Sequence, residues 1–296
     1  MLRRCLLAAS VLLSLVVAGC GNDAGGGGDG KVRVVAAFYP LQFVSERLGG
    51  DRVTVTNLTK AGAEPHDLEL QPNQLAQIEN ADLVVYLAGF QPAVDEAVRG
   101  QAKDRSFDVA AVEALKDGPG DGDEPAGKDP HVWLDPVRLS VVVGQLADRM
   151  AEVDTAGAEE IKGRATQLQG ELQELDKEFS TGLATCARRD IVTSHAAFRY
   201  LADRYKLNQI PISGLDPEAE PSPQQVTEVA RLAKEKGVTT IFFEALVSPK
   251  LSETVAKEIG AKAAVLDPLE GVEGSDTYFT VMRANLTALR DALSCG

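Results

Sequence analysis

Histidine and tryptophan are scarce in this chain, and a long apolar run is missing. The 296 residues include three histidines, one tryptophan and four cysteines. The main apolar run, 6–17, is shorter than the roughly 20 residues that a helix needs to cross a bilayer. A membrane-spanning helix is therefore not expected.

Clusters of basic residues are also missing. The chain has 30 lysines and arginines against 44 acidic residues, which gives a net charge of −14. Long-range attraction to phosphates needs a basic surface, so nucleic acid is not expected as a partner. An acidic surface attracts cations instead, although it also favours solubility.

The N-terminus has the features of an export signal. Arg3 and Arg4 precede the apolar run, and small residues lead to Cys20. This arrangement predicts a signal peptide over 1–19, and the cysteine after Ala-Gly is typical of a bacterial lipobox. We expect Cys20 to be lipidated, with ordinary signal cleavage as the alternative. The glycine-rich segment 20–30 then forms a flexible tether.

This N-terminus also predicts a location. The protein is expected to be exported and anchored by lipid to the outer face of the cytoplasmic membrane, or on the periplasmic side if the cell has an outer membrane. In such an oxidising compartment Cys186 and Cys295 are expected to form a disulfide. The alternative is that both cysteines are thiolate ligands of a metal.

Short β-branched runs alternate with longer amphipathic stretches from residue 31 onward, which predicts mainly parallel sheets covered by helices. The length suits two doubly wound α/β lobes, over 31–155 and 185–296. The expected strands are 32–37, 53–58, 83–87 and 107–109 in the first lobe, and 191–194, 209–212, 239–243 and 263–266 in the second.

One long helix is predicted between the lobes. Apolar residues spaced by three and four mark it over 157–184, inside a linker of 156–184. We expect this helix to act as a rigid strut that joins the lobes; the alternative is an ordinary surface helix of one domain. Asp135-Pro136 and Ser222-Pro223 are predicted to begin two further helices.

A low-complexity loop, 116–130, is rich in glycine, proline and acidic residues. It is interpreted as a mobile, solvated surface loop. A cation-gathering flap is the alternative function.

Each of the three histidines lies in a short apolar or proline-bounded segment: EPHDLEL at His66, DPHVWLDP at His131 and VTSHAAFRYLA at His195. Neutral imidazole is a common metal ligand at physiological pH. Doubly wound sheets bind their ligands at the carboxyl ends of the strands. All three histidines could lie at such strand ends. The sequence therefore predicts a site with three histidines.

The fourth donor is expected to be an oxygen. Asp267 directly follows the expected strand 263–266 and is the preferred carboxylate, with Glu64 and Glu244 as substitutes. Nitrogen-rich sites favour later transition metals such as Zn²⁺ over Mn²⁺. The spacing matches no local zinc motif, so the residues alone leave the convergence of these ligands unproven.

The segments GAEPHDLELQP, DPHVWLDP, TSHAAFRYLA, FFEALVSPKL and VLDPLEG, in this order behind a lipobox, carry a resemblance over nearly the whole mature chain. The chain resembles the zinc-binding, ZnuA-like lipoprotein receptors of bacterial metal ABC importers. This cluster of proteins also includes manganese receptors and proteins once named adhesins.

The resemblance implies two α/β lobes that hold one metal ion between them, with His66, His131, His195 and Asp267 as ligands. Manganese members of the family tend to have a carboxylate at the position of His195, so the resemblance also favours zinc. It implies a monomer that catalyses no reaction and delivers zinc to a membrane permease driven by a cytoplasmic ATPase. Because the long helix resists bending, we expect only small movements of the lobes. Many zinc receptors of this kind carry histidines in the acidic loop, whereas 116–130 contains none.

Three alternatives remain at this point. The chain could be a manganese receptor or an adhesin of the same family. It could also be a secreted zinc hydrolase, because three protein ligands and an open position are typical of catalytic zinc sites. In that case Glu64 or Glu244 would act as the general base.

Overall fold

The computed structural model of the chain describes residues 30–119, 127–272 and 274–296. The signal peptide, Cys20 and the tether up to residue 29 lie outside these ranges, and so does the middle of the acidic loop. Among the described residues, no helix combines the length and the apolar character that crossing a membrane requires.

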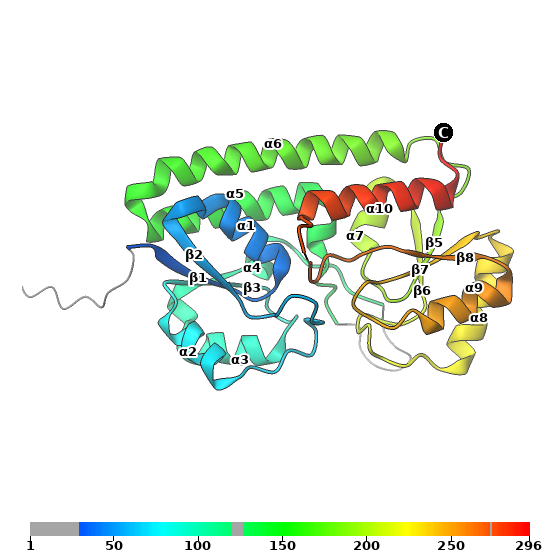
Figure 1. Cartoon of the computed structure of the whole chain (residues 1–296), viewed down its shortest axis with the longest axis horizontal. Helices are drawn as coiled ribbons and strands as arrows, with labels where there is room; N and C mark the ends of the chain where they lie inside the picture. Colours follow the sequence, from blue (N-terminus) through cyan, green and yellow to red (C-terminus); the bar gives the residue numbers. More distant parts are fainter. Residues whose placement is uncertain (1–29, 120–126, 273) are drawn as a thin grey trace, which may run out of the picture. The chain divides into compact units, whose positions relative to one another are not determined.

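Two four-stranded parallel sheets form the framework (Figure 1). The first has the order β2-β1-β3-β4, and its strands are β1 (Val32–Ala36), β2 (Val53–Asn57), β3 (Leu83–Tyr86) and β4 (Ser106–Asp108). The second has the order β6-β5-β7-β8, and its strands are β5 (Asp190–Thr193), β6 (Asn208–Pro211), β7 (Thr240–Phe243) and β8 (Lys262–Val265). Each strand overlaps one that the sequence predicts.

Both sheets have the same connectivity. In the first, β1 pairs in parallel with β2 on one side and with β3 on the other, with Val34 opposite both Val55 and Leu83. In the second, β5 pairs in the same way with β6 and β7. The strand order reverses beside β1 and β5, and ligands of such sheets bind beyond the carboxyl ends of the strands at these points.

Helices cover the sheets and connect them. In the first half they are α1 (Tyr39–Gly49), α2 (Pro72–Asn80), α3 (Pro92–Gln101), α4 (Val109–Val112) and α5 (Pro136–Val153). In the second half they are α7 (Arg199–Tyr205), α8 (Pro223–Glu235), α9 (Lys250–Ile259) and α10 (Tyr278–Leu293).

Two helix starts follow the sequence signals. The Asp135 carboxylate accepts hydrogen bonds from the first free backbone N–H groups of α5, and the Ser222 hydroxyl does the same for α8. In both helices a proline occupies the first turn, where its missing N–H costs nothing.

The long helix α6 (Ala158–Gly182) lies where 157–184 was predicted. Its 25 residues correspond to roughly 38 Å. It packs along α5 and also contacts α1 and α10 (Figure 1). Its buried face consists of the residues at the predicted spacing: Ile161, Ala165, Leu168, Leu172, Leu175 and Phe179. The two parallel-sheet lobes and the long helix between them confirm the predicted fold class.

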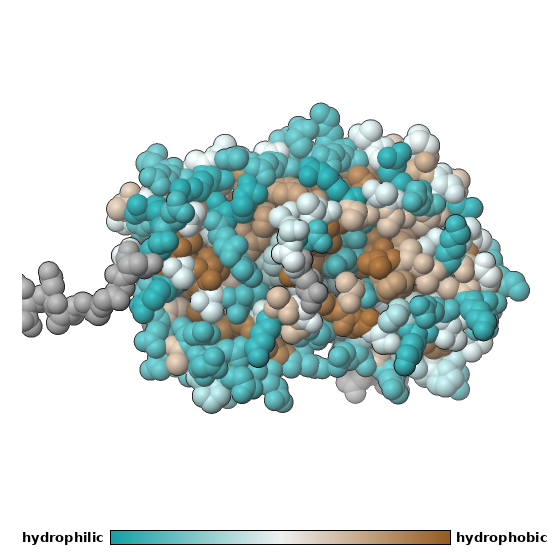
Figure 2. Space-filling view, in the orientation of Figure 1, coloured by the Kyte–Doolittle hydropathy of each residue, from teal (hydrophilic) through white to brown (hydrophobic). Residues whose placement is uncertain are grey.

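A continuous apolar core connects the two lobes. It includes residues of the first sheet, the buried face of α6, and α7 and α10 of the second half. A smaller cluster around Val192, Ile241 and Val255 fills the other face of the second sheet. The face drawn in Figure 2 is mainly polar, with hydrophobic side chains in parts of it. Nearly all the buried hydrophobic residues that the structure describes belong to these two clusters.

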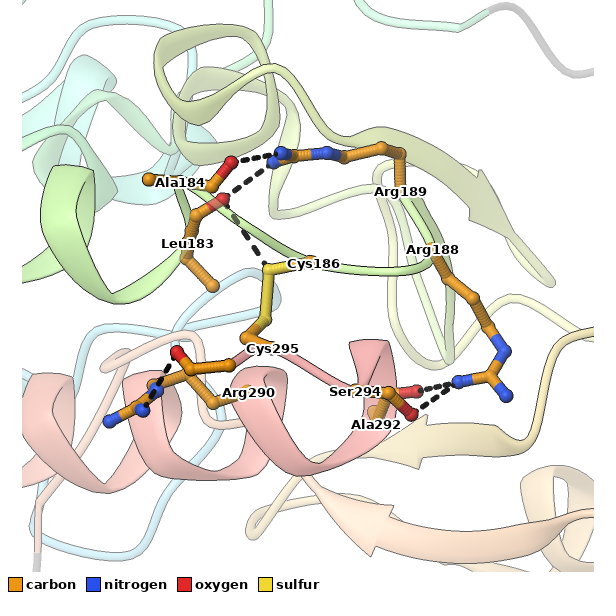
Figure 3. The surroundings of a disulfide bond; sticks show 10 residues. Leu183, Ala184, Cys186, Arg188, Arg189, Arg290, Ala292, Ser294 and Cys295 are labelled. Carbon is orange, nitrogen blue, oxygen red and sulfur yellow. Dashed lines mark hydrogen bonds between the residues drawn. A yellow bond between two sulfur atoms is a disulfide. The ribbon is translucent and has the colours of Figure 1, made fainter.

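The predicted disulfide is present. Cys186, just beyond α6, is bonded to Cys295 at the end of α10 (Figure 3). Backbone hydrogen bonds flank it on both sides: Ala187 N donates to Ser294 O at 3.2 Å, and Gly296 N donates to Thr185 O at 3.1 Å. The disulfide leaves neither cysteine free to be a thiolate ligand, which removes the alternative of a cysteine metal site.

Candidate metal site

The three histidines reach the same place from three loops. His66 lies in the loop between β2 and α2, His131 in the long connection after β4, and His195 two residues after β5. The ring centroids are 5.5 Å apart for His66 and His131, 5.1 Å for His131 and His195, and 5.8 Å for His66 and His195. His131 and His195 are fully buried, and the His66 side chain is 11% exposed. The structure thus brings all three predicted histidines together.

The fourth member of the group is Glu270, in the loop after β8. Its Oε1 atom lies 3.2 Å from His66 Nε2, 3.0 Å from His131 Nε2 and 3.6 Å from His195 Nε2. One ligand atom from each of the four residues can be chosen so that all lie within 4.8 Å of one another. Among the described residues, this is the group that could hold a metal ion.

The structure places the expected fourth donor, Asp267, outside this group, and Glu270 is the carboxylate within it. The Asp267 Oδ1 atom accepts a hydrogen bond from Leu269 N at 2.7 Å, and its backbone N–H and C=O bond to the Asn285 side chain. Burial raises the pKa of Asp267 to about 6. Asp267 closes a local turn, as aspartate before proline often does, and the turn presents the longer Glu270 side chain to the histidines.

The two substitute carboxylates lie beside the group without entering it. Glu64 accepts the backbone N–H of His66 at 2.9 Å, and its Oε1 is 3.8 Å from His66 Nε2. Glu244, directly after β7, accepts from His195 Nδ1 at 2.5 Å and from the Ser194 hydroxyl. Because Nδ1 faces away from Glu270, Glu244 orients the imidazole rather than completing the group.

Asp129 orients the second buried imidazole in the same way. Its Oδ1 accepts from His131 N at 3.0 Å and bonds His131 Nδ1 at 2.8 Å. Carboxylates that bond one ring nitrogen fix the tautomer, so that the other nitrogen presents its lone pair to a metal. His131 and His195 are therefore held with Nε2 toward Glu270, each by a carboxylate of its own half of the chain.

The charges of the group are coupled. Burial opposes a charge on His195, but the Glu244 and Glu270 carboxylates outweigh it and raise the pKa of His195 to about 10. Burial likewise opposes a charge on His131, and Asp129 and Glu270 raise its pKa. Burial would raise the pKa of Glu270, but the three histidines hold it well below its usual range. Without metal the site is therefore a buried ionic network.

This network predicts a pH-dependent stability of the metal-free protein. Because the folded pKa of His195 is above the unfolded value, its contribution is fully present below pH 6.5 and is lost as the pH rises through about 10. Replacing Glu244 with glutamine keeps an acceptor for Nδ1 but removes the charge. The loss of unfolding free energy caused by Glu244→Gln is expected to be largest near pH 6.5 and to shrink toward pH 10.

Urea unfolding with a chelator present, at several pH values, measures this effect. Glu258→Gln, at an exposed position of α9, is the control and should leave the pH dependence unchanged. A loss that stays constant from pH 6.5 to 10 would contradict the electrostatic coupling between Glu244 and His195.

The donor set matches a small tetrahedral ion. Tetrahedral zinc with bonds of about 2.0–2.1 Å holds its donor atoms about 3.3 Å apart. His131 Nε2 and His195 Nε2 are 3.3 Å apart, and Glu270 Oε1 is at 3.0–3.6 Å from the three Nε2 atoms. Four of the six distances between the donor atoms are thus close to those around a tetrahedral zinc ion, and one ligand atom from each of the four residues lies within 4.8 Å of the others.

The sequence contained an indication that Glu270 is the donor, but distance from the end of the strand did not reveal it. Both carboxylates of the segment VLDPLEG follow β8, and Asp267 is the nearer one. Aspartate before proline commonly bonds its own backbone, which would have reserved Asp267 for the turn and left Glu270 as the donor. Asp129, also overlooked, stands two residues before His131 in the same motif.

The two described ends of the acidic loop are held together by backbone hydrogen bonds. Asp129 N donates to Lys116 O at 2.9 Å, and Gly118 N donates to Gly127 O at 2.7 Å. The Tyr200 hydroxyl accepts from Lys116 N at 2.8 Å and donates to Asp129 O at 2.9 Å. Residues 120–126 lie outside the described ranges, so the interpretation of the loop as a solvated insertion stays a prediction.

Fold and site together define a two-lobed α/β protein in which residues of both lobes form a buried group of three imidazoles and one carboxylate that could hold a metal ion. The family model described as "Zinc-uptake complex component A periplasmic" matches residues 34–292. The chain belongs to this family.

Known relatives agree with this assignment. The chain is 34% identical to the high-affinity zinc uptake system protein ZnuA of Bacillus subtilis (strain 168), with 94% of each chain covered. It is 35% identical to the zinc-binding protein AdcA of Streptococcus pyogenes serotype M3, over 88% of this chain and 56% of that protein. The chain thus spans little more than half the length of that relative.

A solved structure is similar as well. The laminin-binding protein Lmb of Streptococcus agalactiae, described as a bifunctional protein with adhesin and metal transporting activity, matches with a TM-score of 0.81. The two sequences are 32% identical, and the match covers 89% of this chain and 99% of that one.

Proposed function

We propose that the protein captures one Zn²⁺ ion outside the cytoplasm, using His66, His131, His195 and Glu270 as ligands. The observation that carries this proposal is the convergence of three imidazoles and one carboxylate from both lobes on one buried point. Membership of the zinc-uptake family supports zinc as the cargo, and so do the names of two relatives.

The donor chemistry favours zinc over manganese. Three nitrogen donors suit a borderline, later transition metal, whereas manganese prefers oxygen-rich sites with more than four ligands. The carboxylates Asp129 and Glu244 strengthen this preference, because they raise the donor strength of the two buried imidazoles.

The protein acts as the receptor of an ABC importer. The family name supports an exported, periplasmic component of an uptake complex, whose membrane permease and cytoplasmic ATPase receive and drive the cargo. Cys20 is the proposed lipid anchor, and the receptor works as a monomer. Its N-terminal lobe is 31–155, its linker 156–184 and its C-terminal lobe 185–296, with only small lobe movements on release.

Two other functions have less support. A zinc hydrolase needs an open coordination position for water, but Glu270 lies where that position would be. Catalysis is therefore not part of the proposal. An adhesive role is printed for the similar protein Lmb. The described residues of this chain show no surface feature that indicates an adhesive partner, so metal capture remains the proposed role.

Metal competition tests the proposal. The purified chain, stripped with a chelator and dialysed against equal zinc and manganese, is expected to retain one zinc per molecule by elemental analysis. In the same assay His195→Glu is expected to reduce the preference for zinc by about tenfold, or about 1.4 kcal/mol, because it replaces a nitrogen donor with oxygen.

His195→Gln is the matched control, since it removes the imidazole without adding a charge and should weaken both metals. Wild-type protein that retains no zinc would overturn the proposed function. An unchanged preference in His195→Glu would overturn the selectivity argument alone.

A further inference from the structure

The turn that presents Glu270 has an unfavourable backbone. Leu269, the preceding residue, has φ +61° and is fully buried. The left-handed region is unfavourable for a residue with a Cβ, so such a turn persists only where its surroundings hold it. The position of the Glu270 carboxylate therefore depends on the groups that hold this turn.

Two of these groups belong to the second half of the chain. Asp267 Oδ1 accepts from Leu269 N at 2.7 Å. The Asn285 side chain on α10 donates to Asp267 O at 2.7 Å and accepts from Asp267 N at 2.9 Å. These bonds fix the beginning of the turn and leave the Pro268 carbonyl for another partner.

That partner comes from the first half. Trp133 Nε1 donates to Pro268 O at 2.7 Å. Trp133 stands two residues after His131, is 2% exposed, and is the single tryptophan of the chain. The bond thus joins the loop that carries His131 to the turn that carries Glu270.

The indole is itself held firmly. Its ring lies 4.9 Å from the ring of Phe38, 5.8 Å from Phe90 and 5.2 Å from the His131 imidazole, measured between centroids. A buried donor fixed this well can hold a strained turn, because losing the bond would leave the Pro268 carbonyl buried without a partner.

We infer that Trp133 is a positioning residue for Glu270, and that its indole N–H slows the release of the bound ion. This inference rests on the proposed function. The ion leaves only when a ligand moves away, and Glu270 can withdraw when the turn around Leu269 relaxes. The hydrogen bond from Trp133, which belongs to the other lobe, to Pro268 O opposes that relaxation. Capture is expected to change little, because the indole N–H bonds the Pro268 carbonyl and no ring nitrogen of the histidines.

Release kinetics test the role of Trp133. Zinc-loaded Trp133→Phe, which keeps an aromatic ring but lacks the N–H donor, is mixed with excess EDTA. We expect its release rate to rise about tenfold, within the range for loss of an outer-shell partner of a metal site. The association rate is expected to stay within about twofold of wild type, so that the affinity change lies in release.

Tyr278→Phe is the matched control. It removes the hydrogen bond of 2.8 Å from the Tyr278 hydroxyl to the Trp133 backbone carbonyl. The ring contacts of the indole and its bond to Pro268 O remain, so release should stay within about twofold of wild type. Equal acceleration in both variants would overturn the inference in favour of general lobe cohesion. Unchanged release in Trp133→Phe would overturn it as well.

A second replacement guards against a variant that folds poorly. Because the chain has one tryptophan, biosynthetic incorporation of β-(3-benzothienyl)alanine replaces only the indole N–H with sulfur. It should accelerate release as Trp133→Phe does. An analogue that releases zinc at the wild-type rate would overturn the inference.

Hydrogen exchange separates this inference from the proposed function. In the metal-free protein, amides of 266–272 are expected to exchange faster in Trp133→Phe than in Tyr278→Phe. This comparison needs no zinc, so it would stand even if wild-type protein held none. Equal exchange in the two variants would contradict the role of Trp133 in holding the turn.

Discussion

Replacing Glu270 with glutamine is expected to weaken zinc binding by about a thousand-fold, or about 4 kcal/mol, the cost typical of removing one partner from a buried charge pair. Glu270 is 1% exposed and lies within 3.6 Å of all three imidazole Nε2 atoms. Glutamine keeps the size and one oxygen but loses the only negative charge in the donor set. Competition against a chelator of known zinc affinity measures the change.

Asp267→Asn provides the control for this experiment. Asparagine retains the oxygen that accepts from Leu269 N, so the turn should persist. Zinc affinity is expected to stay within about threefold of wild type. The opposite pattern, with a large loss for Asp267→Asn and a small one for Glu270→Gln, would restore Asp267 as the ligand and reject the assignment of Glu270.

Removing the disulfide is expected to lower the free energy of unfolding by about 4–5 kcal/mol, the chain-entropy value for a loop of about 100 residues. Cys186 and Cys295 are 109 residues apart in sequence. The double variant Cys186→Ala/Cys295→Ala frees the unfolded chain, while the backbone bonds beside the cysteines remain in the folded state. Its denaturant m value should rise, because the unfolded chain exposes more surface.

Unfolding by guanidinium chloride, with a chelator present, measures both quantities. Wild-type protein reduced with a thiol is the control and should unfold like the double variant. Zinc affinity of the folded double variant should be unchanged, since the disulfide lies at the end of α10 opposite to Tyr278 and the Trp133 contact. A change in unfolding free energy below about 1 kcal/mol would contradict the entropic account.

Much of the fold could be predicted from local patterns. A buried parallel strand such as β3 is a short run of Leu, Val and Tyr, and α6 repeats apolar residues at helical spacing. The starts of α5 and α8 could also be predicted, because Asp135 and Ser222 accept hydrogen bonds from the first backbone N–H groups of their own helices. These features depend on residues close in sequence, so the sequence predicts them without knowledge of the tertiary contacts.

The site was predictable only in part. The segments around the three histidines predicted that all three are metal ligands. The resemblance to metal receptors indicated that they lie close together in the fold. The fourth donor depended on a turn whose shape is decided by Asn285 on α10 and by Trp133 in the other lobe. Asp267 and Glu270 are three residues apart, and nothing in their spacing says which one faces the histidines.

The sequence by itself determined the strands, the helices, the cysteine pair and the choice of imidazole as the main donor, because these follow from neighbouring side chains and from the chemistry of each residue. Only the tertiary structure decided that Glu270 completes the group, that Asp129 and Glu244 orient the rings, and that Trp133 reaches Pro268. Glu244 meets His195 because their strands, β7 and β5, are paired in the second sheet. Glu270 and Trp133 meet partners in the other half of the chain, and these contacts are a consequence of how the two lobes pack.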